Sequence, residues 1–241
     1  METARPRVVP FSKMLSLFER AFVWTGGAIF VASLIVTAWL YTLQLGVTEP
    51  FHGWTPVIID ALLMTLFAAH HSVFARDAVK NGLARLIPDR LLRSVYVWVA
   101  SLLLIAVCAG WQRVGGDLYR TAGPLYVCAV AIDLLGVWMI ARSVRALSAL
   151  ELAGIRASEP GEPLTFNGVY GFVRHPLYLG WMLIVFVTPH MTGDRLAFAL
   201  LTTVYLWIAI PWEERALERS HGEAYRRYKQ QVRWRVVPGV Y

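Results

Sequence analysis

The chain has 241 residues, 57% of which are hydrophobic, and its mean hydropathy is +0.50. This composition excludes an ordinary soluble globular domain, in which apolar residues are fewer and charged residues more frequent. The formal net charge of +7 could indicate a nucleic-acid partner. However, the basic residues fall in loops between apolar runs and form no compact basic domain, so no nucleic-acid partner is expected.

Apolar runs recur along the chain, and several are long enough to cross a bilayer as a helix. We expect spans near residues 22–45, 55–74, 94–112, 123–141, 177–190 and 196–212. The sequence therefore predicts an all-α fold, a polytopic integral membrane bundle of about five to six spans that includes a C-terminal hairpin. The first run is too long for a signal-peptide core, so we expect it to be retained. The fifth gives roughly 21 Å of helix, too little to cross the bilayer without tilting, thinning it or remaining partly re-entrant.

The basic residues indicate the orientation in the membrane. Nearly all Lys and Arg residues fall on one side of the predicted spans, and only Arg113, Arg120 and Arg195 fall on the other. The positive-inside rule then predicts that both termini are cytoplasmic. We expect one membrane domain in three parts, namely a cytoplasmic lead (1–21), a four-span region (22–156) and a C-terminal hairpin with a cytoplasmic helix (157–241).

The second expected span contains an acid and ends in two histidines. Asp60 is a functional candidate because an acid within a span is costly, but it could instead fix packing near the outer boundary, with water or Arg113 as its partner. His70 and His71 are adjacent, so they point about 100° apart on a helix and at most one easily faces the bundle. This spacing does not suit a metal pair, and no metal site is expected.

Three further residues within the expected spans carry polar or reactive groups. Cys108 and Cys128 are expected to be buried structural thiols without a disulfide, because nothing near them has a metal-binding spacing. Asp133 is the deepest acid of the chain, and we expect a partner for it, which the sequence alone does not identify.

Two polar motifs flank the last hairpin. RHPLYLG (174–180) comes before it and WEERALERSHGEAYRRY (212–228) after it, so the hairpin returns both to the same membrane face. Pro176 suits the first turn of a helix, and His175 then lies at the cap position. The N–H groups of this helix start, beside Arg174, would favour an anionic ligand group.

Glu213 and Glu214 follow Pro211, where the last apolar helix is expected to leave the bilayer. An acidic pair that prefers cations would therefore face a helix start that prefers anions. We predict a zwitterionic ligand between them.

This pattern resembles the isoprenylcysteine carboxyl methyltransferase superfamily of integral membrane methyltransferases. Its C-terminal signature is Arg-His-Pro-x-Tyr-x-Gly, an apolar hairpin, a Glu-Glu pair and a Tyr-rich tail. The resemblance implies that S-adenosylmethionine binds to the C-terminal hairpin, with His175, Tyr178 and the Glu213/Glu214 pair near it. We expect the binding site also to include Arg174, Pro176, Gly180, Tyr225 and Tyr228.

The first half is similar to a narrower group, the bacterial methanethiol S-methyltransferases and related membrane proteins of denitrification clusters. The similarity lies in Asp60, AHHSVFAR (69–76), IPDRLLRSVYVWVASL (87–102) and Trp111. In that group Gln more usually precedes the His-Ser pair, and His70 stands there in this chain. The resemblance implies methyl transfer to a small thiol, giving dimethyl sulfide, in the inner membrane of a bacterium.

Catalysis of methyl transfer needs the donor to be positioned, water to be excluded and the thiol to be activated. The candidates for these tasks are Arg174 and His175 at the donor, and His71 or Asp60 at the acceptor.

Other functions remain open at this point. A prenylcysteine carboxylate or a phospholipid amine could replace the thiol as acceptor. Two alternatives belong to other functional classes. One is an NADPH-dependent membrane reductase with a similar C-terminal hairpin, and the other is a non-catalytic membrane protein of a denitrification or respiratory complex. The acceptor depends on the shape of the cavity, and the sequence defines no oligomeric state.

Overall fold

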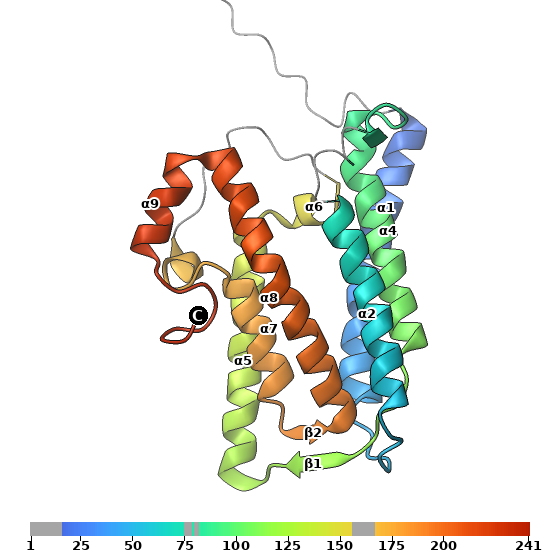
Figure 1. Ribbon diagram of the computed structural model, residues 1–241, viewed down its shortest axis with the longest axis vertical. Helices are drawn as coiled ribbons and strands as arrows, with labels where there is room; N and C mark the ends of the chain where they lie inside the picture. The colour runs from blue at the N-terminus through green and yellow to red at the C-terminus, as the bar shows by residue number, and fades with distance from the viewer. Residues whose placement is uncertain (1–15, 75–78, 80–81, 156–166) are drawn as a thin grey trace, which may run out of the picture.

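A computed structural model describes residues 16–74, 79, 82–155 and 167–241, and the statements below concern these residues. Long helices run side by side along the molecule (Figure 1). Five of them are long and apolar enough to cross a membrane: α1 with its π-helical end (Leu17–Gln44), α2 (Thr55–Phe74), α4 (Asp89–Gly110), α5 (Gly123–Ala146) and α8 (Gly193–His221). The predicted polytopic helical fold is confirmed.

The first helix begins earlier than the predicted residue 22. Ser16 and Glu19 form a capping box, in which the Ser16 N–H donates to the Glu19 carboxylate (2.8 Å) and the Glu19 N–H donates to the Ser16 hydroxyl (3.3 Å). Such a box satisfies donors that a helix start otherwise leaves unpaired, so the helix starts at Leu17. Glu19 also forms an ion pair with Arg90 near the start of α4 (2.5 Å), which joins these two helix ends.

The predicted short run is the helix α7, Pro176–Phe186, of 11 residues, which is roughly 16 Å long. It falls short of a span, as expected from its sequence. A small antiparallel sheet of β1 (Asp117–Arg120) and β2 (His190–Thr192) lies at one end of the bundle, where α7 turns into α8. This sheet was not predictable from the sequence, because strands of three or four residues leave no hydropathy pattern.

Short elements complete the chain on the side opposite the sheet. They are α6 (Ala149–Leu152), the 3-10 turn η3 (Gly168–Gly171) and α9 (Glu223–Gln231). α8 continues through Pro211 to His221, and Gly222 then adopts φ +54, which ends α8 and starts α9. The predicted C-terminal helix is therefore divided in two at this glycine.

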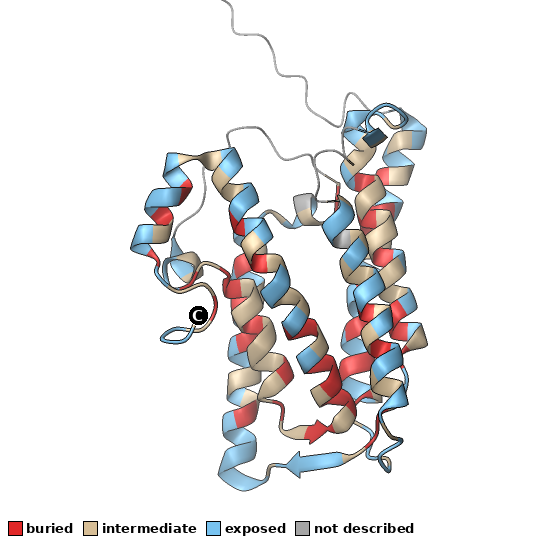
Figure 2. Ribbon diagram, viewed as in Figure 1, coloured by how far each residue is buried: buried red, intermediate tan, exposed pale blue. Residues whose placement is uncertain are grey.

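Two helix pairs pack most extensively, α1 with α4 and α5 with α7. In the second pair Gly136 and Gly180 face each other, and a Cβ atom on either would lie 2.7 Å from the carbonyl oxygen of the other. Small residues of this kind let two membrane helices approach closely. The main apolar core lies toward the sheet end, around Tyr41, Trp111 and Phe198 (Figure 2).

Buried polar groups tie the start of α8 to the rest of the bundle. The fully buried carboxylate of Asp194 accepts hydrogen bonds from the N–H groups of Val114 and Gly115, both at 2.9 Å. Arg195, which the sequence suggested as an outer-loop residue, lies in the first turn of α8 and is only 9% exposed. Its guanidinium donates to the carbonyl oxygens of Thr42 (3.0 Å) and His190 (2.6 Å).

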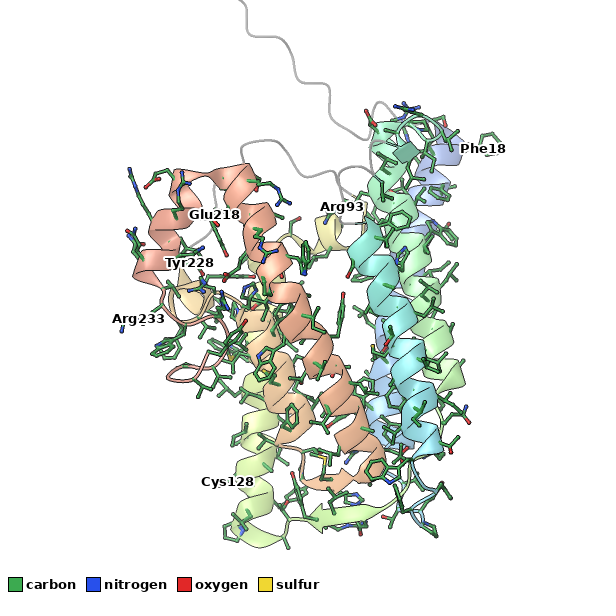
Figure 3. The ribbon with its side chains drawn as sticks, viewed as in Figure 1. Phe18, Arg93, Cys128, Glu218, Tyr228 and Arg233 are labelled. Atoms are coloured by element: carbon green, nitrogen blue, oxygen red, sulfur yellow. The ribbon has the colours of Figure 1, made fainter. Side chains whose placement is uncertain are left out.

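The prediction for the cysteines is half correct. Cys108 is buried, with its sulfur 3.4 Å from the Thr37 hydroxyl, but Cys128 is exposed on the outer side of α5 (Figure 3). Apolar side chains of the same part of α5 are also exposed, so Cys128 lies on an outward-facing apolar surface. The partner expected for Asp133 is not found among the described residues, where its Oδ1 is buried without a hydrogen-bond partner.

Candidate active site

The Arg174–Glu214 ion pair is the buried centre of the site. Nε of Arg174 lies 2.7 Å from Oε1 of Glu214, and the two side chains are 7% and 5% exposed. Arg174 also donates from Nη1 to the carbonyl oxygens of Val232 and Arg233, both at 2.8 Å. Arg235 approaches the other oxygen of Glu214 at 3.4 Å. The charge of Glu214 is thus balanced by two arginines, as a buried carboxylate requires.

His175 occupies the N-cap position of α7 without a capping hydrogen bond from its side chain, and the helix begins at Pro176 as predicted. Its Nε2 lies 3.4 Å from Oε1 of Glu214, in a geometry that does not make a hydrogen bond, and its Nδ1 lies 3.7 Å from Oε2 of Glu213. The imidazole stacks on the ring of Tyr178, with 5.2 Å between centroids and 2° between planes. The ring is therefore fixed in orientation while Nε2 has no hydrogen-bond partner among the residues described.

Glu213 differs from Glu214 although the two are adjacent. Its carboxylate accepts a hydrogen bond from the Tyr178 hydroxyl at 2.7 Å, and its side chain is 45% exposed. No Lys or Arg of the described residues forms an ion pair with it. Glu213 is therefore the member of the acidic pair that can accept a cation or a hydroxyl from a ligand.

The C-terminal segment completes the site, a role that was not predicted from the sequence. The N–H groups of Arg174 and His175 donate to the carbonyl oxygens of Trp234 (3.0 Å) and Arg235 (2.8 Å). The start of α7, suggested as an anion site, is thus partly covered by the chain itself, and Pro176 is fully buried. Arg235 also lies over the ring of Tyr241 and donates to its hydroxyl at 2.8 Å. In the sequence, only the number of basic residues on this membrane side could have indicated that the C-terminal segment contributes to the site.

The two tyrosines of α9 form the wall behind the ion pair. Tyr225 and Tyr228 are 1% and 4% exposed, with 5.8 Å between their ring centroids. Tyr228 donates to the carbonyl oxygen of Tyr170 at 2.7 Å, and Figure 3 shows it on the side of α9 that faces the protein. Burial, with the nearby Glu214, raises the pKa of both phenols, so both are neutral at physiological pH. The Tyr225 hydroxyl has no hydrogen-bond partner within the described ranges.

Two predicted site residues lie apart from this cluster. Gly180 is in the α5–α7 contact described above, where it serves close packing. Asp60 is five residues after the start of α2, near the sheet end, and its carboxylate accepts a hydrogen bond from the Gln112 N–H at 2.8 Å. Since Glu213 is twenty residues after the start of α8 at that same end, the two acids are separated along the bundle by roughly 20 Å.

His71 lies in the last turns of α2, but its side chain is outside the described part of the structure. Arg113, suggested as a partner of Asp60, instead donates to the side chain of Gln44 at 2.7 Å. Among the described residues no group of three or more His, Cys, Asp or Glu side chains could hold a metal ion.

The site thus offers one open carboxylate, a fixed imidazole and a phenol above a neutralised ion pair. These groups can bind and orient a ligand that carries a cation and hydroxyl groups. They provide no nucleophile for covalent catalysis, which a direct transfer between two bound substrates does not need.

Comparison with known proteins identifies the family to which this chain belongs. The phospholipid methyltransferase family matches residues 124–224. The chain is 36% identical to methanethiol S-methyltransferase of Crocosphaera subtropica, over 74% of this chain and 73% of the relative. It is 33% identical to methanethiol S-methyltransferase 2 of Bradyrhizobium diazoefficiens, over 78% of this chain and 76% of the relative.

Methanethiol S-methyltransferase of a Pseudomonas species is 35% identical, over 78% of this chain and 74% of that protein. More distant relatives include a nurim homologue of Drosophila melanogaster, at 26% identity over 71% and 74% of the two chains. No solved structure matches. The chain is an integral membrane methyltransferase and belongs to the family that contains the bacterial methanethiol S-methyltransferases.

Proposed function

We propose that the protein transfers a methyl group from S-adenosylmethionine to a small thiol, with methanethiol as the acceptor and dimethyl sulfide as the product. The bond between the sulfonium and its methyl group breaks as the thiol sulfur bonds to that carbon, S-adenosylhomocysteine leaves, and the thiol proton is released to water. The relatives with more than 30% identity bear the name of this activity. The observation that carries the proposal is the open carboxylate of Glu213 beside the stacked rings of His175 and Tyr178.

The residues of the site fit the methyl donor. S-Adenosylmethionine carries an ammonium group and ribose hydroxyls, and the Glu213 carboxylate can accept hydrogen bonds from either. The Tyr225 hydroxyl is a buried polar atom without a hydrogen-bond partner among the described residues, so it can pair with a polar group of a ligand. Nε2 of His175 lies 3.4 Å from the Glu214 carboxylate and is suited to donate a hydrogen bond. When bound, the donor supplies an electrophilic methyl carbon on a sulfonium.

The role of the protein is then to bind, orient and exclude water. Arg174 holds Glu214 and the C-terminal segment in place, and so positions His175 and Glu213 at the donor. A membrane bundle gives a small apolar thiol access from the lipid and keeps water from the reacting atoms. We further propose that the protein lies in a bacterial inner membrane with both termini in the cytoplasm, because the basic loops gather on one side.

The test is a methyl-transfer assay with the detergent-purified protein. We expect the labelled methyl group of S-adenosylmethionine to appear in dimethyl sulfide when methanethiol is the acceptor. Transfer to a prenylcysteine or to phosphatidylethanolamine in place of methanethiol would refute the thiol assignment.

Ligand-dependent thermal stability tests the donor separately, since a ligand that binds the folded state must stabilise it. S-Adenosylmethionine and S-adenosylhomocysteine should raise the melting temperature, and NADPH should not. A shift with NADPH alone would refute the donor and favour the reductase.

A further inference from the structure

A histidine of α2 has polar atoms that the Glu213 cluster does not use. Both imidazole nitrogens of His70 are buried, and neither has a hydrogen-bond partner among the residues described. Burying a polar group without a partner is costly, so such a group in a folded protein calls for a ligand or another explanation.

Aromatic rings hold this imidazole in place. It stacks on Tyr96 of α4, with centroids 5.6 Å apart and 13° between the planes, and it contacts Phe74 at 4.5 Å. One turn earlier on α2, Phe67 meets the ring of Tyr205 of α8 edge-on, with centroids 6.1 Å apart. Tyr96 covers one face of the imidazole and Phe74 packs beside Tyr96 with 5.9 Å between their centroids, so neither ring offers a hydrogen-bond partner to the nitrogens at the imidazole edge.

The position of His70 relates it to the methyl-donor site. The ring of Tyr205 meets Phe67 of α2, and Tyr205 lies eight residues before Glu213 on α8, about 12 Å along that helix. α2 and α8 both start at the sheet end of the bundle (Figure 1). From that end His70 lies about 22 Å along α2, while Tyr205 and Glu213 lie about 18 Å and 30 Å along α8. His70 is therefore at a level between them, on the facing helix.

We propose that His70 binds the methyl acceptor, through a hydrogen bond between its imidazole and the sulfur of a small uncharged thiol. The assignment rests on the proposed function. A neutral imidazole offers one donor and one acceptor, and an S–H group can take either part. A thiol forms only weak hydrogen bonds and competes poorly with water for an exposed site, so a dry imidazole suits it. The rings that contact His70 carry no formal charge, which favours an uncharged acceptor over a carboxylate or an ammonium group.

In this role His70 binds and orients the acceptor sulfur and transfers no proton. A glutamine amide has the same donor and acceptor pair, so it can replace the imidazole. This distinguishes binding from general-base catalysis, which glutamine cannot perform.

The test compares His70→Phe, which keeps a stacked ring and lacks the nitrogens, with His70→Gln. In His70→Phe the KM for methanethiol should rise about tenfold, the size of one hydrogen bond, and the thermal shift caused by S-adenosylhomocysteine should not change. In His70→Gln the KM for methanethiol should stay within about threefold of the wild type. Thr65→Ala, on the exposed side of α2, is the matched control.

An unchanged methanethiol KM in His70→Phe would overturn the assignment, as would an equal rise in His70→Gln. A weaker thermal shift with S-adenosylhomocysteine in His70→Phe would assign the residue to the donor instead. If this variant does not fold, His70→Leu takes its place with the same expectations. A wild-type protein that methylates no small thiol would refute the proposed function itself, and that failure is visible before any variant is made.

Discussion

Loss of the Arg174 guanidinium is expected to destabilise the protein strongly. The side chain is 7% exposed, pairs with the buried Glu214 at 2.7 Å and donates to two carbonyl oxygens of the C-terminal segment. Removing one partner of a buried ion pair costs about 3–5 kcal/mol, because the other charge stays buried. Arg235 remains near Glu214 at 3.4 Å and compensates in part, so we expect a loss of about 3 kcal/mol in Arg174→Ala. For a chain of this size that is a fall in melting temperature of roughly 6–12 °C.

The assay is the melting temperature of the detergent-purified variants, measured without ligand. Arg226→Ala is the control, because Arg226 is 56% exposed and its ion pair with Glu223 lies on the surface. It should melt within about 1–2 °C of the wild type. An Arg174→Ala protein that melts with the wild type would refute the view that this ion pair holds the C-terminal segment on the site.

Three further predictions concern single residues. Glu213→Gln should weaken S-adenosylhomocysteine binding about tenfold or more, because a charge-assisted hydrogen bond is lost, and the melting temperature without ligand should stay near that of the wild type. Calorimetry measures the affinity and melting curves the stability, and an unchanged affinity would contradict the role of Glu213. Gly180→Leu should lower the melting temperature by overpacking the contact with Gly136, a loss of about 1–3 kcal/mol or more, and a wild-type melting curve would show that α5 and α7 are not in close contact. Asp60→Ala should lower the melting temperature and leave both KM values unchanged, because it removes the acceptor of the Gln112 N–H, which lies far from Glu213. A raised methanethiol KM would return Asp60 to the acceptor site.

The features that follow from hydropathy were predictable from the sequence. Apolar runs predicted the helices, because a membrane-spanning run must pair its own backbone polar groups and a helix does so. Pro176 predicted the start of α7, because a proline fits the first turn of a helix. The proximity of His175 to Glu213 and Glu214 also followed, since a hairpin returns its two ends to one face.

Features that depend on tertiary contacts were not predictable in the same way. The cover of α7 by the segment around Arg235 arises from backbone hydrogen bonds, which leave no side-chain pattern. The exposure of Cys128 depends on which face of α5 turns inward, and that face is set by Gly136 against Gly180. The different environments of Glu213 and Glu214 follow from their 100° separation on α8. The sequence could not show which of the two forms the ion pair with Arg174, because that depends on how α8 is rotated in the bundle.

The short length of α7 has a consequence for biogenesis. A helix of 11 residues is too short to be inserted into a bilayer by itself, which takes about 20 apolar residues. α7 must therefore enter together with α8 as one hairpin and come to rest against α5, which precedes both in the chain. His175 at the start of α7 and Glu213 near the end of α8 meet only when this hairpin has closed. We therefore expect the proposed methyl-donor site to be assembled in the last stage of membrane insertion, after the N-terminal helices are in place.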